Sequence, residues 1–158
     1  MKKTARAIAL LLALAALSCL LCACGGRTER SDVPVEELAA AVDTAIGGEG
    51  FSTVDESYVN GRLQLDLSKC DDYIVRLSVV DEYGVFRAKD ADAAKALRDE
   101  VRAYLDNRLA TWMDEYMPEE KPKVENADCR VFGNYVVYAI LSESGRSAAF
   151  SAVDAALQ

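Results

Sequence analysis

Pairs of adjacent acidic residues are the first groups in this sequence whose type is suited to chemistry. They include Asp55-Glu56, Asp71-Asp72, Asp81-Glu82 and Glu119-Glu120. Two carboxyl groups act as acid and base only where their surroundings separate their pKa values. Adjacent residues on a strand point to opposite faces, and in loops they are usually solvated. The pairs therefore indicate a polar surface. They also lack the spacing of a calcium-binding loop, so we assign no metal ligand.

A second candidate for chemistry is Ser68-Lys69-Cys70, which places a hydroxyl and a thiol beside a lysine amine. Such a nucleophile is activated by a general base held in contact with it. The chain contains no histidine, which excludes a Ser-His-Asp triad and imidazole ligation of a metal. Because no second lysine or histidine motif completes the pair, we assign no catalytic residue and no cofactor.

Cys70 and Cys129 are the only cysteines that follow Cys24. Outside the cytoplasm, an oxidising environment would allow a disulfide between them. Two buried, unpaired thiols are the favoured alternative, because the spacing along the chain does not reveal whether their Cα atoms lie within disulfide range.

The N-terminal segment carries the strongest pattern. Lys2, Lys3 and Arg6 precede an almost wholly apolar run over residues 7–21, which is typical of a secretory signal peptide. The uncharged run over residues 7–26 is also about long enough to span a bilayer, so an uncleaved transmembrane anchor is the alternative.

Leu21-Cys22-Ala23-Cys24, followed by two glycines, favours cleavage because it resembles the lipobox of bacterial lipoproteins. The resemblance implies removal of residues 1–23 as a signal peptide and a diacylglyceryl group on the sulfur of Cys24. At about 0.8 kcal/mol per buried methylene, two acyl chains form a stable membrane anchor where one is marginal. Residues 24–31 would be the lipidated cysteine and a short linker, and residues 32–158 a single domain facing outside the cytoplasm.

Composition restricts the partners of that domain. The chain has 158 residues, 51% of them hydrophobic, which suffices for one ordinary domain. Its net charge is -8, from 26 acidic and 18 basic side chains, and removal of Lys2, Lys3 and Arg6 would take it to -11. Binding to a phosphate backbone needs clustered Lys and Arg, so the composition argues against a nucleic-acid partner.

Helices and hairpins must position these side chains. Apolar residues spaced by three and four predict a helix over residues 34–46, a long helix from Ala91 to Met117 that ends before Pro118, and a terminal helix over residues 149–157. The same spacing favours a place for the aromatics in the core or at its amphipathic edges, with a sugar- or peptide-binding platform as the alternative. The aromatics are Tyr104, Trp112, Tyr116, Tyr135 and Tyr138.

Alternation of β-forming residues predicts two hairpins. The first joins strands over residues 73–80 and 85–89 through turn residues 81–84. The second joins strands over residues 129–132 and 135–141 through Gly133-Asn134, a pair suited to a two-residue turn. With residues 49–69 left unassigned, the order α-β-β-α-β-β-α predicts an α+β fold. We expect a four-stranded antiparallel sheet with its helices packed mainly on one face.

Several short segments of the mature chain together resemble domain of unknown function family 4358. They are Val85-Phe86-Arg87-Ala88-Lys89-Asp90, Tyr116-x-Pro118-Glu119-Glu120, Glu125-Asn126-Ala127 and Gly133-Asn134-Tyr135-Val136-Val137. Residues 49–67 depart from the more regular acidic helix of that family. The resemblance implies a lipoprotein of Gram-positive, Firmicutes-type bacteria, and it supplies no activity and no catalytic residue.

Three functions remain open. The leading one is a non-catalytic binding or interaction module, anchored to the cell membrane through Cys24, with an unknown protein or envelope component as its partner. The second is a carboxylate-dependent hydrolase acting on cell-envelope material, which needs two acidic side chains in one cleft and a raised pKa on one of them. The third is a small solute-binding lipoprotein, which the length disfavours because the usual examples close two lobes around a ligand.

Overall fold

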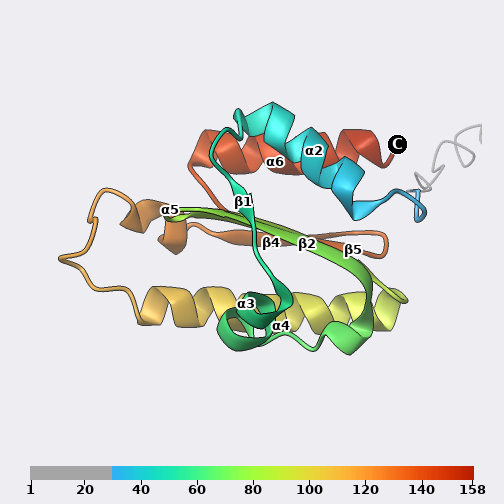
Figure 1. Ribbon diagram of the computed structural model, residues 1–158, viewed down its shortest axis with the longest axis horizontal. Coiled ribbons are helices and arrows are strands. Elements are labelled where there is room, and N and C mark those ends of the chain that lie inside the picture. The colour runs from blue at the N-terminus through green and yellow to red at the C-terminus, as the bar shows by residue number, and fades with distance from the viewer. Residues whose placement is uncertain (1–29) are drawn as a thin grey trace, which may run out of the picture.

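The computed structural model describes residues 30–158 (Figure 1). The predicted signal peptide, the lipidation site at Cys24 and most of the predicted linker lie outside the described residues. Among residues 30–158, no helix combines the length and the apolar character needed to cross a bilayer.

One antiparallel sheet of five strands forms the middle layer of the fold. The strands lie in the order β1-β2-β3-β5-β4. They are β1 (Ser52–Thr53), β2 (Cys70–Ser78), β3 (Asp81–Ala88), β4 (Asp128–Phe132) and β5 (Tyr135–Ile140). The α+β class and both hairpins are confirmed. The prediction of four strands is wrong because it missed the edge strand β1. The two residues of β1 are too few to show an alternating pattern.

Helices cover both faces of this sheet. Helices α2 (Val35–Ile46) and α6 (Glu143–Ala156) lie side by side on one face, and α4 (Ala91–Ala110) crosses the other (Figure 1). A separate apolar core fills each interface. The prediction that the helices pack mainly on one face is therefore wrong. The physical reason is visible in β5, where all six residues are buried, so both faces of the strand require cover.

The unassigned segment before β2 folds into short turns against the α4 face. They are helix α3 (Glu56–Tyr58), the π-helical turn η1 (Val59–Leu63) and the 3-10 turn η2 (Leu67–Lys69). Asp55 begins the series by accepting a hydrogen bond from the Tyr58 N–H at 2.9 Å. A further short helix, α5 (Lys121–Glu125), precedes β4.

The turn of the first hairpin lies earlier than predicted. Ser78 pairs with Asp81, which leaves Val79-Val80 as the two turn residues. Because valine is typical of strands, the sequence predicted that the strand continues through these two residues and that the turn lies at residues 81–84. In the second hairpin Gly133 has a φ of 56°, as expected for the first position of its two-residue turn.

Helix α4 also ends earlier than predicted, at Ala110 rather than Met117. The Thr111 hydroxyl donates a hydrogen bond to the Asn107 carbonyl at 2.8 Å where the helix stops. Residues 112–120 leave the helix as a loop.

Helix α6 begins at Glu143, before the predicted start, because the Ser142 hydroxyl caps it by accepting the Gly145 N–H at 3.2 Å.

Candidate functional site

A pocket of about 300 Å³ lies where the β2–β3 turn, η1 and the C-terminal end of α4 meet. It is lined by Arg62, Val79, Val80, Arg108, Thr111, Trp112, Met113 and Tyr116. Three of these residues, Val79, Met113 and Tyr116, are exposed over 76%, 65% and 54% of their surface and are among the few large apolar side chains exposed in residues 30–158. Apolar side chains gathered around a hollow are typical of a binding site.

The pocket also contains hydrogen-bond donors without acceptors. The Arg108 Nε and the Trp112 Nε1 atoms are both buried, and neither makes a hydrogen bond to a described residue. The ion pairs within residues 30–158 involve neither Arg62 nor Arg108. Because a buried donor without an acceptor costs about 1–3 kcal/mol, this pocket favours a ligand that supplies one.

The early end of α4 creates this arrangement. A continuous helix would carry Trp112 and Tyr116 along the buried stripe, as the sequence predicted. Instead the chain turns after Ala110, and the Trp112 and Tyr116 rings lie 6.1 Å apart at 56° in the loop that follows. The sequence allowed both aromatics a place in the core or at its edge: Trp112 is half-buried against the core, and Tyr116 is exposed. No sequence pattern linked either arginine to the loop, so the site was missed.

Two residues beyond Val80, the carboxylate of Glu82 is fully buried. It accepts hydrogen bonds from the hydroxyls of Tyr138 at 2.6 Å, Tyr104 at 2.8 Å and Tyr58 at 3.2 Å. Burial, and next the charge of Glu82, raise the pKa of all three tyrosines, while the charge of Arg108 partly opposes the rise at Tyr58 and Tyr104. The hydroxyls therefore remain protonated donors, and Glu82 acts as the centre of a structural network.

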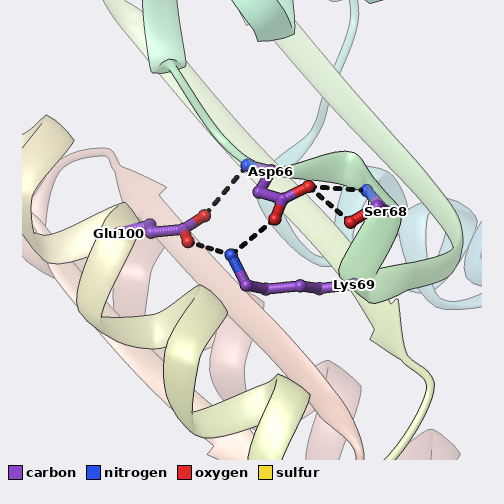
Figure 2. Close-up of polar contacts among 4 residues, drawn as sticks. All are labelled: Asp66, Ser68, Lys69 and Glu100. Carbon is purple, nitrogen blue, oxygen red and sulfur yellow. Dashed lines mark hydrogen bonds and ion pairs between the residues drawn. The ribbon is translucent and has the colours of Figure 1, made fainter.

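Figure 2 shows the polar contacts that Ser68 and Lys69, from the candidate segment Ser68-Lys69-Cys70, make in the structure. Lys69 Nζ contacts Glu100 Oε1 on α4 and lies 2.9 Å from Asp66 Oδ2, and the Ser68 hydroxyl donates to Asp66 Oδ1 at 2.6 Å. The hydrogen bonds to Glu100 and Asp66 raise the pKa of Lys69. The amine stays charged and cannot act as a base for Ser68. These contacts instead attach η2 to α4.

The acidic pairs do not form a catalytic dyad. Asp81 lies 2.7 Å from Lys123 Nζ, while its neighbour Glu82 is enclosed by tyrosines. Hydrogen bonds lower the pKa of Asp55 and Asp99, and those from Ser68 and Lys69 lower the pKa of Asp66 to about 2. A general acid needs the opposite shift. Within residues 30–158, no three acidic or thiol groups come together as a metal site would require.

Cys70 and Cys129 are both free thiols in this structure. They lie on β2 and β4, which β3 and β5 separate. Three strand spacings amount to roughly 14 Å, well beyond the Cα separation that a disulfide allows. Burial raises the pKa of each thiol to about 12, which keeps both unreactive.

Of the aromatics that the sequence assigned to the core, Tyr104, Tyr135 and Tyr138 are confirmed as buried. Tyr135 donates a hydrogen bond to the Val33 carbonyl at 2.7 Å. The two that contribute to the pocket, Trp112 and Tyr116, are those that follow the end of α4.

Comparison with known proteins gives one match. A family model described as domain of unknown function (DUF4358) matches residues 48–141, which run from the end of α2 to the end of β5. No curated protein and no solved structure matches the chain.

Proposed function

Since this chain belongs to the DUF4358 family, whose description assigns no activity, we propose its function from its own residues. We propose that it is a lipoprotein of a Gram-positive bacterium, held at the outer face of the cell membrane by a diacylglyceryl group on Cys24. Its domain, residues 32–158, binds a partner from the envelope or its surroundings without catalysing a reaction.

The observation that carries the binding role is the pocket beside the β2–β3 turn. It combines exposed apolar side chains with the buried, unpartnered donors of Arg108 and Trp112. A surface that served only stability would cover the apolar groups and pair the donors. The groups suited to catalysis are in contrast engaged with neighbours, as Lys69 is by Glu100 and Glu82 by three tyrosines.

The position of the pocket agrees with this role. The Arg30 N–H donates to the Leu157 carbonyl at 2.9 Å, so the described chain begins beside the C-terminal end of α6. Figure 1 shows this end of the domain on the right and the loop over residues 111–120 at the opposite end. A tether preceding Arg30 would therefore attach at the end remote from the pocket, which leaves the pocket open to a partner.

The anchor is tested by intact-mass analysis of the native protein and by fractionation of a Cys24→Ala variant. We expect a mass that begins at Cys24 and includes acyl chains, and a variant that no longer sediments with membranes. An acidic domain is repelled by anionic headgroups, so the lipid alone would hold it there. A native mass that begins at Met1 without acyl chains would overturn the anchor.

The binding role is tested by photocrosslinking in intact cells. A photoreactive residue at Met113, on the pocket rim, should give a discrete adduct detected by mass. The matched control places the same residue at Glu37, which is exposed on α2 on the other side of the sheet. Equal labelling from both positions, or no adduct from Met113, would contradict a binding site at this pocket.

A further inference from the structure

We propose that this pocket takes a small organic anion, with an oxyanion group held between Arg62 and Arg108 and an apolar or aromatic body lying against the rim. This inference rests on the proposed binding function and names the class of ligand. The pocket holds hydrogen-bond donors without acceptors and apolar side chains without cover, and no described residue supplies both the acceptor and the cover. A ligand of this class supplies the two together.

The charge of the site supports the anionic group. The domain carries an excess of acidic residues, and four of the nine arginines in residues 30–158 form an ion pair. Among them, Arg76 lies 3.1 Å from Glu36, Arg98 lies 2.7 Å from Asp99, and Arg130 lies 2.9 Å from Asp128. Arg62 and Arg108 approach the same hollow with no such partner. A guanidinium offers parallel N–H donors that match the two oxygens of a carboxylate or phosphate.

The rim supports the apolar body. Val79 and Met113 line the same pocket as the arginines and expose most of their surface, and the Trp112 and Tyr116 rings, which also line it, lie 6.1 Å apart. Met adapts its shape to varied ligands because it is unbranched and polarizable. Val79 has a φ of 52°, a conformation that costs a β-branched residue energy and that is found more often at ligand sites than elsewhere.

The size and position of the pocket argue against larger partners. A volume of about 300 Å³ lies at the small end of the range for ligand sites. A lipid headgroup has the same anionic chemistry, but the pocket is lined by the loop over residues 111–120, which lies at the end of the domain opposite the C-terminal end of α6, where the described chain begins (Figure 1). Free phosphate would use the arginines and leave the rim uncovered.

The test uses the fluorescence of Trp112, which is the only tryptophan in the chain and lines the pocket. The detergent-solubilised full-length protein is titrated at low salt with 3-phenylpropionate and with 3-phenylpropionamide, which has the same shape without the charge. We expect saturable binding of the acid, with the amide and inorganic phosphate each weaker by about tenfold or more. Equal binding of acid and amide, or of acid and phosphate, would overturn the proposal.

Variants locate the anion. Arg62→Gln and Arg108→Gln should each weaken binding of 3-phenylpropionate by about tenfold. Arg98→Gln removes the same charge from α4 about ten residues away and should leave binding unchanged. Because Arg62 is exposed, its variant tests the proposal even if Arg108→Gln does not fold. Equal losses in Arg62→Gln and Arg98→Gln would mean a general charge effect and would overturn the proposal.

Vesicles of phosphatidylglycerol separate a lipid source from a soluble one. A Trp112 response to vesicles with none to 3-phenylpropionate would overturn the small-ligand assignment in favour of a membrane surface. An adduct from Met113 in cells, together with no response to 3-phenylpropionate, would leave the binding function standing and remove this ligand class.

Discussion

Gly84 on β3 and Tyr138 on β5 lie opposite each other, and the Tyr138 ring occupies the space that a side chain at Gly84 would need. A Cβ atom at Gly84 would overlap that ring and lie 3.0 Å from Phe86 Cε2. The close approach lets the ring lie over β3, where its hydroxyl reaches Glu82 at 2.6 Å. The absence of a side chain at Gly84 is thus a condition for the buried tyrosine network.

The first prediction follows from this contact. Gly84→Ala should lower the free energy of unfolding by about 2 kcal/mol, because a methyl group in a filled core displaces its neighbours. Urea unfolding at 25 °C measures the change. Gly61→Ala is the matched control, since nothing lies within 4 Å of a Cβ at that position. A loss at Gly61 equal to that at Gly84 would show that helix or strand propensity, and not the Tyr138 ring, sets the cost.

The second prediction concerns the acceptor of the network. Glu82→Leu leaves the hydroxyls of Tyr58, Tyr104 and Tyr138 without their shared acceptor, and it should lower the free energy of unfolding by at least about 3 kcal/mol. Tyr138→Phe removes one short bond and should cost about 1.5–3 kcal/mol, with Tyr58→Phe costing less because its bond is longer, at 3.2 Å. Denaturant unfolding of the three variants gives the order. Equal stability of Glu82→Leu and the unaltered protein would contradict the role of Glu82.

The sequence predicted this network only in part. It placed Tyr104 and Tyr138 in the core, because helical and strand spacing is a local property. It treated Glu82 as one of several surface acids, since nothing local distinguishes a solvated carboxylate from one enclosed by hydroxyls from α3, α4 and β5. A sequence pattern shows which face of a helix or strand is apolar. It does not show that a polar side chain is buried by residues of other helices and strands.

The pocket shows the same limit of sequence-based prediction. The strands and the long helix that form it were largely predicted, but the end of β2 and the end of α4 were not. Val79-Val80 has strand composition and forms a turn, and the apolar spacing after Ala110 continues although the helix stops. Element ends are decided by tertiary packing and capping more than by periodicity, and binding residues gather at such ends.

The third prediction uses the strain at the pocket rim. Val79 has a φ of 52° and is exposed over 76% of its surface, so its side chain contributes little packing to offset the unfavourable backbone. Val79→Gly should raise the free energy of unfolding by about 1 kcal/mol, since glycine adopts this region freely. Thermal unfolding measures the gain. Val131→Gly, at an exposed valine in β4, should instead lower it. A loss of stability in Val79→Gly would mean that Val79 is unstrained.

The fourth prediction is a dependence on pH. The folded protein lowers the pKa of Asp66 from 3.8 to about 2, through hydrogen bonds from Ser68 and Lys69. A carboxyl group with a depressed folded pKa stabilises the fold above its unfolded pKa, and this contribution disappears as the pH falls through the folded value. Asp66→Asn should therefore be less stable than the unaltered protein above pH 4, and the two should converge toward pH 2.

Urea unfolding at several pH values tests that convergence. Ser68→Ala removes the hydrogen bond that lowers the pKa of Asp66 most. The stability that this variant loses at low pH should lie between the loss in the unaltered protein and the loss in Asp66→Asn. A constant difference between Asp66→Asn and the unaltered protein from pH 2 to pH 7 would contradict the lowered pKa of Asp66.

The fifth prediction concerns the two thiols. Because Cys70 and Cys129 lie on β2 and β4 with two strands between them, a reducing agent should leave the melting temperature of the protein unchanged. Burial raises the pKa of both to about 12, so neither forms much thiolate at pH 8, and an alkylating reagent should label them only after unfolding. Mass analysis before and after denaturation counts the labels. A Cys129→Ser variant with unchanged melting temperature on reduction provides the control, and a drop in the unaltered protein alone would mean that the strands rearrange to form the bond.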